Sequence, residues 1–246
     1  IVQKCCHDFD MISWLMGSPC KSVSSYGSLL YFNKENAPAG SAERCVDCKV
    51  SDCPYNAHKI YFDNGEIGFD AAGNRFWPCD ILVENPTREK LENAIANGPY
   101  GKCVFRCDNN VVDNQVANMS FENGAVATLT MTGFSAKNFR EYKIFCTKGE
   151  ITADQGKNII TVTRFGENPV EYDINKIAVD LSGHGGGDNR MLDEMFASLE
   201  HGGETASSIK TSVRTHLMAF AAEKSRLSGG KQIFIDDVYS ENSEKK

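Results

Sequence analysis

One histidine near the start of the chain has neighbours that suit acid–base chemistry. His7 and Asp10 are three residues apart and Trp14 follows at helical spacing, which predicts that all three lie on one stripe of a helix. A carboxylate one turn from an imidazole can accept its ring N–H, fix its tautomer and raise its basicity. The pair therefore suggests a general acid/base at His7. An ordinary histidine in the first turns of a helix, with solvated acids nearby, explains the same spacing.

Three cysteines form a second candidate site. They follow the pattern Cys45-x2-Cys48-x4-Cys53 and are followed by Pro54. Tetrahedral zinc takes four ligands, usually thiolate or imidazole, so this spacing predicts a structural zinc site. An iron–sulfur cluster fits less well because no four-cysteine run is present. Three free thiols in a surface loop are the alternative. The sequence does not select the fourth ligand from its candidates, which are His58, Cys79, Cys103 and Cys107.

A glycine-rich stretch at residues 182–188 precedes a predicted helix. Its glycines do not satisfy G-x-G-x-x-G, no strand–turn–helix–strand unit surrounds them and no Walker lysine follows, so we reject a nucleotide-binding loop. A tight turn that leads into a helix, with Asp188 as its N-cap, explains the pattern. In a narrower functional interpretation, the amides of this helix start and His184 bind a polar or anionic group.

Polar residues are dense at residues 100–115, just before the first strand of a predicted hairpin. Asp113 and Gln115 stand closest to that strand. Polar side chains at the mouth of a sheet often line a pocket, although an ordinary turn contains the same residue types. Both residues are therefore candidates for substrate contacts.

The composition is that of a globular protein. The 246 residues are 41% hydrophobic and 24% charged, with a net charge of −7 and no basic run interleaved with aromatics, which argues against a nucleic-acid or anionic-membrane partner. No apolar run approaches the ~20 residues of a membrane span and no signal-peptide pattern is present. We expect the ten cysteines to be reduced and the protein to be cytoplasmic. A first residue Ile1 suggests a fragment or a processed chain.

The elements that must position these residues begin with a helix over residues 4–17. Phe9, Ile12 and Met16 give it a core-facing stripe, and Gly17 suits its end. A strand is expected at 21–32 and a long loop at 33–51. A short helix or turn at 55–62 and a helix at 87–97, capped by Thr87, are expected to follow.

From residue 115 the hydrophobic period changes to two. Asn123-Gly124 predicts a hairpin between strands at 116–121 and 125–134. Further strands are expected at 142–146, 150–153, 159–165 and 170–174. Two helices should follow, one from Asp188 to His201 and one from Ser207 or Ser208 to Leu227, then a strand at 232–235 and a frayed end at 240–246. The fold class is α+β: an open, mostly antiparallel sheet with helices on one face. Because a second helical layer is lacking, we expect a partner subunit to cover the other face.

An ordered set of these motifs resembles a known family. The set is Lys4-x-x-His7-Asp8-x-Asp10 with Trp14-Leu15-x-Gly17, the hairpin at 116–125, Thr147-Lys148-Gly149-Glu150-Ile151, Gly183-His184-Gly185-Gly186-Gly187-Asp188 and the last long helix. It resembles the C-terminal domain of the glucose–fructose oxidoreductase/inositol dehydrogenase (Gfo/Idh/MocA) family from Lys4 to about Ile235. The cysteine loop with Pro54-Tyr55 resembles a subset of that family.

The resemblance implies a substrate and oligomerisation domain that works with an N-terminal Rossmann domain, which binds NAD(H) or NADP(H) and has no counterpart in this chain. Members mostly oxidise or reduce sugars, inositols and related polyols. His7 aligns with the catalytic histidine of the family. Many members have Asp four residues earlier, where this chain has Gln3, and the neighbouring Lys4 is expected to take part of that role. The substrate-binding candidates are then Lys4, Asp10, Asp113, Gln115, His184 and Asp188.

The leading hypothesis is that residues 1–246 form a single substrate-binding and oligomerisation domain of an NAD(P)-dependent sugar or polyol oxidoreductase. The chain alone is then expected to bind no NAD and to lack dehydrogenase activity. The alternative is a non-catalytic binding or scaffold domain held together by a metal.

Overall fold

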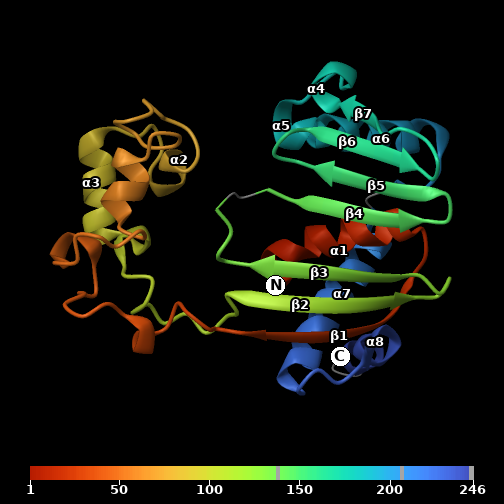
Figure 1. Ribbon diagram of the computed structural model, residues 1–246, viewed down its shortest axis with the longest axis horizontal. Coiled ribbons are helices and arrows are strands. Elements are labelled where there is room, and N and C mark those ends of the chain that lie inside the picture. The colour runs from red at the N-terminus through yellow and green to blue at the C-terminus, as the bar shows by residue number, and fades with distance from the viewer. Residues whose placement is uncertain (137–138, 206–207, 244–246) are drawn as a thin grey trace. The chain divides into compact units, whose positions relative to one another are not determined.

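The computed structural model describes residues 1–136, 139–205 and 208–243, and the chain in it divides into two compact units. One unit comprises Ile1–Ser25 and Ala117–Lys246, and the other comprises Tyr26–Val116 (Figure 1). The second unit is thus inserted into the sequence of the first. The single domain expected for residues 1–246 stays a prediction.

The first unit begins with helix α1, Val2–Met16, which confirms the predicted N-terminal helix. Its buried side chains Cys5 and Phe9 lie one turn apart and fix one face of the helix in the core. Gly17 ends the helix in the left-handed conformation, at φ 60°, and its N–H bonds to the carbonyls of Ser13 and Trp14.

Helix α1 packs on a four-stranded sheet with the order β3-β2-β1-β8. The strands are β1, Cys20–Ser28; β2, Asn114–Phe121; β3, Val126–Thr132; and β8, Ile233–Phe234. The predicted Asn123-Gly124 hairpin joins β2 to β3, with Gly124 at φ 84°. The predicted last strand forms as β8, which pairs antiparallel with β1 and places Val23 opposite Ile233.

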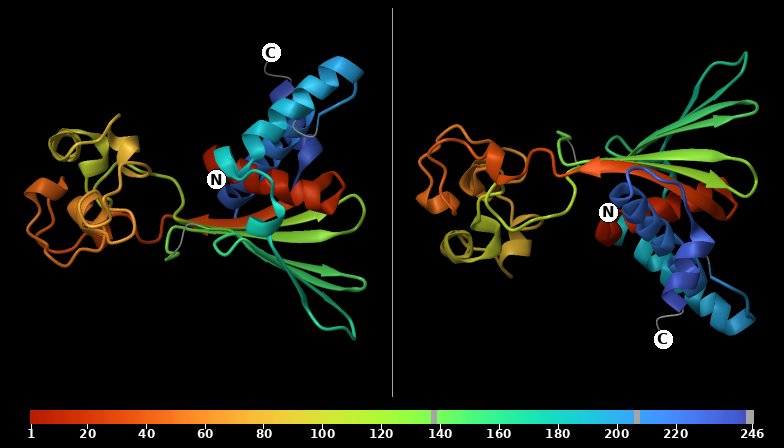
Figure 2. Two further views of the ribbon diagram at one scale, coloured as in Figure 1. Left: turned by 90° about the horizontal axis from the view of Figure 1, so that it is seen from above. Right: turned by 90° about the horizontal axis from the view of Figure 1, so that it is seen from below.

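Four further strands form a second sheet with the order β4-β5-β6-β7, in which every pairing is antiparallel. They are β4, Glu141–Cys146; β5, Gly149–Asp154; β6, Ile159–Arg164; and β7, Val170–Asp173. The strands match the prediction, but they do not continue the first sheet. Residues 133–140 separate β3 from β4 in the sequence, and Figure 2 shows that the two sheets diverge.

The core of the first unit lies between helices and one face of the first sheet, as predicted. Helix α7, Ile209–Leu227, contacts α1 along its length, and helix α8, Ile235–Ser243, packs against α7. Figure 2 shows these helices on one side of the sheet. The expected frayed end is wrong for residues 240–243, which belong to α8, while residues 244–246 lie outside the described residues. The buried apolar side chains of this core include Phe9, Val23, Met119, Phe121, Leu217 and Met218.

Three more helices follow the second sheet: α4, Ile174–Ile177; α5, Ser182–Gly185; and α6, Gly187–His201. Helix α6 has the predicted apolar stripe at Leu192, Met195, Phe196 and Leu199, but all four side chains are exposed and the helix has no buried residue. The prediction that this stripe faces a core is therefore wrong for the described chain, in which the apolar surface of α6 is exposed. The next helix begins after Ser208, whose side chain caps α7, and Ser207, the other predicted start, lies outside the described residues.

The second unit is built from short helices and turns. These are η1, Lys34–Asn36; η2, Cys45–Asp47; η3, Lys59–Asp63; α2, Cys79–Leu82; α3, Arg88–Asn97; and η4, Pro99–Gly101. The predicted helix at 87–97 is confirmed as α3, and Thr87 accepts a hydrogen bond from the N–H of Lys90. The expected loop at 33–51 contains two turns of 3₁₀ helix. The core of this unit is Ala57, Phe62, Phe69, Cys79, Leu91 and Ile95.

Candidate functional site

Helix α1 presents His7 on its exposed side. The opposite side is fixed because Phe9 is fully buried, at 0% exposure, in the core of the first unit. Lys4 is exposed and Asp10 is half-buried on the same helix. Burial on one face holds the helix, while His7 stays open to solvent and can reach a ligand. This is the arrangement that an acid/base group needs.

The expected contact between His7 and Asp10 is not formed. Within the part of the chain that the structure describes, His7 makes no hydrogen bond or ion pair with another residue. The neighbouring carboxylate, Asp8, is held by the guanidinium of Arg140 instead. The predicted pairing of His7 with Asp10 is therefore wrong for the residues that the structure describes.

Asp8 and Arg140 form the best-defined polar cluster beside His7. The hydrogen bond to Asp8 raises the pKa of Arg140, which keeps the guanidinium charged. Burial raises the pKa of Cys5 to about 11, and the carboxylate of Asp8 adds to this shift. Burial likewise raises the pKa of Tyr142 on β4. Sequence reasoning missed Arg140 and Tyr142 because residue 140 is 132 positions away from Asp8.

A second histidine has the carboxylate partner that His7 lacks. Nδ1 of His184 lies 3.0 Å from both carboxylate oxygens of Asp188. The predicted turn is wrong at residues 182–185, which form α5, and the predicted N-cap is wrong because Gly186 occupies that position. Gly186 has φ 87°, and a Cβ there would lie 2.4 Å from the carbonyl oxygen of Asp180, so the turn between α5 and α6 requires glycine. Asp188 lies in the first turn of α6.

Asp113 in the second unit binds backbone rather than facing solvent. Its carboxylate accepts hydrogen bonds from the N–H groups of Leu30 at 2.9 Å, Tyr31 at 2.7 Å and Phe32 at 3.1 Å, and from the side chain of Asn114 at 2.9 Å. This turn ends the predicted strand at Ser28 instead of residue 32. Burial raises the pKa of Asp113, but these donors outweigh it and hold the pKa at about 2.

Gln115 is also buried, at 2% exposure, under Gly27 of β1. A Cβ at Gly27 would lie 2.8 Å from the Cβ of Gln115, so the two strands approach closely at this point. The described contacts give Asp113 and Gln115 structural roles. Their roles in substrate binding stay predictions, as do those of Lys4, Asp10, His184 and Asp188.

The three cysteines of the predicted metal site do come together. Cys45, Cys48 and Cys53 line one small cavity in the second unit, and Cys103 joins them there. His58, Cys79 and Cys107, the other candidates for a fourth ligand, do not line it. All ten cysteines are free thiols.

No helix among the described residues is both long enough and apolar enough to cross a bilayer.

Comparison with known proteins places this architecture in context. Residues 1–232 match the family described as "Oxidoreductase family, C-terminal alpha/beta domain" of the Gfo/Idh/MocA group. A Bacillus subtilis (strain 168) protein named "Putative oxidoreductase YteT" is 23% identical over 210 residues, which are 79% of this chain and 46% of that protein.

Solved structures share the fold. An oxidoreductase domain protein from Kribbella flavida matches 94% of this chain and 50% of its own, with 13% identity and a TM-score of 0.55. A levoglucosan dehydrogenase, solved with NADH and L-sorbose, matches 96% of this chain and 50% of its own, with 15% identity and a TM-score of 0.53. The chain thus spans about half the length of the proteins it matches. Because the family match covers nearly the whole sequence, the chain belongs to the Gfo/Idh/MocA oxidoreductase family, in which it corresponds to the C-terminal α/β domain.

Proposed function

We propose that this chain is the substrate-binding and oligomerisation domain of an NAD(P)-dependent oxidoreductase that acts on a sugar, inositol or related polyol. Membership of the family supports the oxidoreductase class. The observation that carries the proposal is the exposed His7 on a helix whose other face is locked in the core by Phe9. The levoglucosan dehydrogenase that shares the fold was solved with NADH and a sugar, which agrees with this substrate class.

In this proposal His7 handles the proton of the substrate. Oxidation of a carbinol carbon removes a hydride from carbon and a proton from its hydroxyl, and an imidazole accepts that proton near neutral pH. Lys4 is one turn away on the same exposed part of α1 and can donate hydrogen bonds to substrate oxygens. The ion pair of Asp8 with Arg140 ties α1 to the segment that leads into β4 and so fixes the helix that carries His7.

The hydride acceptor is expected to be NAD or NADP. The residues of this chain do not fit a dinucleotide, because the sequence contains no G-x-G-x-x-G after a strand. We therefore assign no cofactor contact to this chain. In the proposal a Rossmann domain elsewhere in the protein holds the cofactor.

Calorimetric titration tests whether the cofactor binds outside this chain. NAD⁺, NADH, NADP⁺ and NADPH are each expected to give no binding heat with the 246-residue chain, and the chain with polyols and either cofactor should produce no reduced nicotinamide. The protein that contains this chain together with its Rossmann domain should bind one of the cofactors and oxidise a polyol. Tight NAD binding by the 246-residue chain would overturn the proposal. A complete protein without dehydrogenase activity on sugars and polyols would favour the non-catalytic scaffold.

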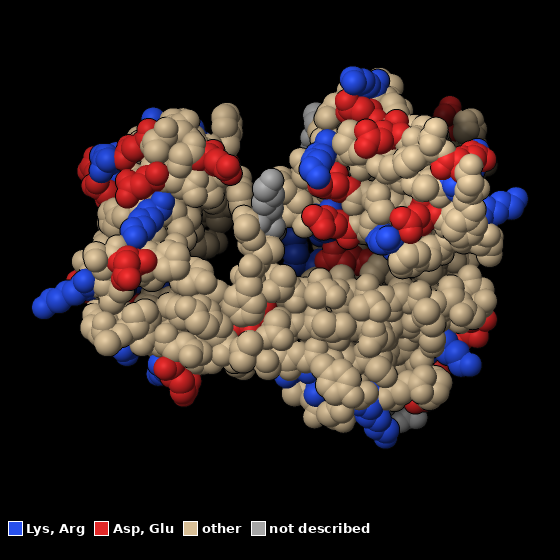
Figure 3. Space-filling model, viewed as in Figure 1, with Lys and Arg blue, Asp and Glu red and all other residues tan. Residues whose placement is uncertain are grey.

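The outer face of the first sheet is the surface that we propose for oligomerisation. Every second side chain of β3 is exposed there, and these are Val126, Thr128, Thr130 and Thr132. The alternate residues Ala127, Leu129 and Met131 pack against the core. Figure 3 shows this strand region free of Lys, Arg, Asp and Glu. A flat sheet face without charge can pack against a second copy at no cost of burying ions.

A charge placed on this face is expected to separate the subunits. Val126 is 76% exposed, so Val126→Glu should leave the fold intact but place like charges opposite one another in a symmetric contact. Analytical ultracentrifugation should show a dimer or tetramer for the unaltered chain and a monomer for V126E. Val179→Glu, at a fully exposed valine outside this face, is the matched control and should keep the assembly. A monomeric unaltered chain, or an assembly that survives V126E, would contradict this role of the face.

A further inference from the structure

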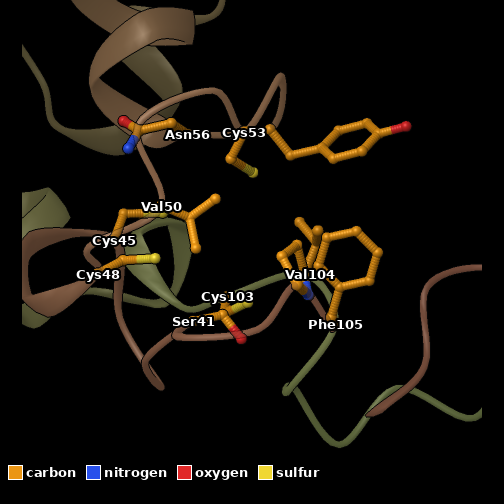
Figure 4. A pocket seen from close by; sticks show the side chains of 11 residues that line it. Ser41, Cys45, Cys48, Val50, Cys53, Asn56, Cys103, Val104 and Phe105 are labelled. Atoms are coloured by element: carbon orange, nitrogen blue, oxygen red, sulfur yellow. The ribbon is translucent and has the colours of Figure 1, made fainter. Parts of the chain in front are cut away.

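Four cysteines of the second unit surround one small cavity. Cys45, Cys48, Cys53 and Cys103 line it from different segments of the chain, as Figure 4 shows. The cavity measures about 20 Å³, which is room for a single ion or water-sized atom. The rest of the lining is mostly apolar and includes Val50, Val104 and Phe105.

Backbone hydrogen bonds bring these cysteines together. The 3₁₀ turn η2 carries Cys45 to Cys48, and the N–H of Cys48 donates to the carbonyl of Cys45 at 3.2 Å. An antiparallel bridge pairs Arg44 with Lys102 and brings together the two chain segments that carry Cys45 and Cys103, both of which line the cavity. A further bond from the N–H of Cys103 to the carbonyl of Glu43, at 2.9 Å, fixes this pairing.

The structure separates Cys103 from the other candidates for a fourth ligand. The thiol of Cys107 turns back to the carbonyl of Val104 at 3.4 Å. The thiol of Cys79 lies in the hydrophobic core of the unit, 3.7 Å from the carbonyl of Tyr61. The ring of His58 stacks on Phe62 with centroids 5.3 Å apart.

The surroundings of the thiols suit a cation. The N–H of Ala57 donates to the sulfur of Cys45 at 3.5 Å, and amide donors of this kind stabilise metal-bound thiolates from outside the ligand set. Thiolates crowded in an apolar cavity repel one another unless a cation neutralises them.

We propose that Cys45, Cys48, Cys53 and Cys103 bind one Zn²⁺ as a structural four-thiolate site. Among the described residues no three ligands already stand at metal-binding spacing, so the four side chains must rotate toward the centre of the cavity. Binding converts four thiols and Zn²⁺ into a tetrahedral thiolate complex and releases four protons. The ion would hold together the irregular segment around η2 and the strand-like segment at Lys102, which otherwise share few regular hydrogen bonds. The site does not depend on the role proposed for His7.

Metal analysis of the 246-residue chain, purified with Zn²⁺ supplied, tests the site. Mass spectrometry of the metal content should find one zinc per chain. Cys103→Ser should weaken zinc binding by roughly 100-fold, because one of four ligands is lost. Cys107→Ser, four residues further along the same loop, is the matched control and should keep one zinc. Co²⁺ in place of zinc should give the visible absorption of a tetrahedral thiolate complex in the unaltered chain and in C107S only.

Thiol alkylation keeps the proposal testable if C103S fails to fold. In the unaltered chain, zinc should protect the four cavity cysteines from iodoacetamide, as read by peptide mass spectrometry, while the exposed Cys146 reacts with or without zinc. A chelator should restore reaction at all four. The proposal fails if the chain holds no stoichiometric zinc, if C107S loses the metal and C103S keeps it, or if the chain contains iron with a visible sulfide-to-iron absorption.

Discussion

Replacing His7 by asparagine, in the protein that contains this chain with its nucleotide-binding domain, is expected to lower kcat for polyol oxidation by roughly 10²–10⁴-fold. Asparagine keeps a polar side chain of similar size but cannot accept the hydroxyl proton. His7 is exposed and none of its described contacts holds the fold, so the loss should come without a change in stability. Steady-state kinetics should show the effect mostly in kcat, because proton transfer belongs to the transition state rather than to binding.

The pH profile separates a catalytic role of His7 from a merely structural one. The limb of the kcat/KM profile on which activity falls toward acidic pH, where a general base is protonated, should disappear in H7N, while the free energy of unfolding stays the same. His201→Asn is the matched control, because His201 is an exposed histidine at the end of α6 and should leave kcat unchanged. An H7N variant with unaltered kcat, or a loss matched by H201N, would contradict the assignment.

Much of α1 could be predicted from the sequence because the information in it is local. The stripe that contains Phe9 and the glycine that ends the helix both act within a few residues, and the structure confirms both. The partner of Asp8 could not be predicted in the same way. Arg140 reaches it from a segment 132 residues away, so only the folded chain brings the two charges together. The apolar stripe of α6 is another feature that the sequence predicts only in part. Its spacing predicts a buried face but does not indicate which surface covers it, and in the structure the stripe is exposed.

The cysteine cavity likewise has one part that local sequence predicts and one part that only the folded chain shows. The spacing of Cys45 and Cys48 follows from one 3₁₀ turn and is visible in the sequence. The sequence does not show that Cys103 rather than Cys107 lines the cavity. That depends on the pairing of Arg44 with Lys102 and on the direction in which each thiol points. Asp113 is a third case. Its position before a strand suggested a pocket, but in the folded chain its carboxylate binds the backbone of residues 30–32, which is about 80 positions away and cannot be predicted from local spacing.

Replacing Asp113 by asparagine is expected to lower the free energy of unfolding by about 3 kcal/mol at pH 7. Asp113 is only 6% exposed, and its carboxylate accepts three backbone N–H bonds, from Leu30, Tyr31 and Phe32. An amide offers one acceptor oxygen and turns an NH₂ group toward the remaining donors, which leaves them without an acceptor. Urea unfolding followed by circular dichroism measures the global effect, and amide hydrogen exchange at Tyr31 and Phe32 measures the local one.

The stabilising contribution of Asp113 is expected to depend on pH. The pKa of Asp113 is about 2 in the folded chain, below its ordinary value of 3.8, so the charged form is favoured by folding. This contribution, about 2 kcal/mol, is present above pH ~4 and is lost as the pH falls toward 2. The stability difference between the unaltered chain and D113N should therefore be constant from pH 7 to 5 and should shrink below pH 4. Asp108→Asn, at an exposed aspartate in the same stretch, should change neither stability nor its pH dependence. A difference between the unaltered chain and D113N that stays constant down to pH 2 would mean that the three amides need the second oxygen atom of Asp113 and not its negative charge.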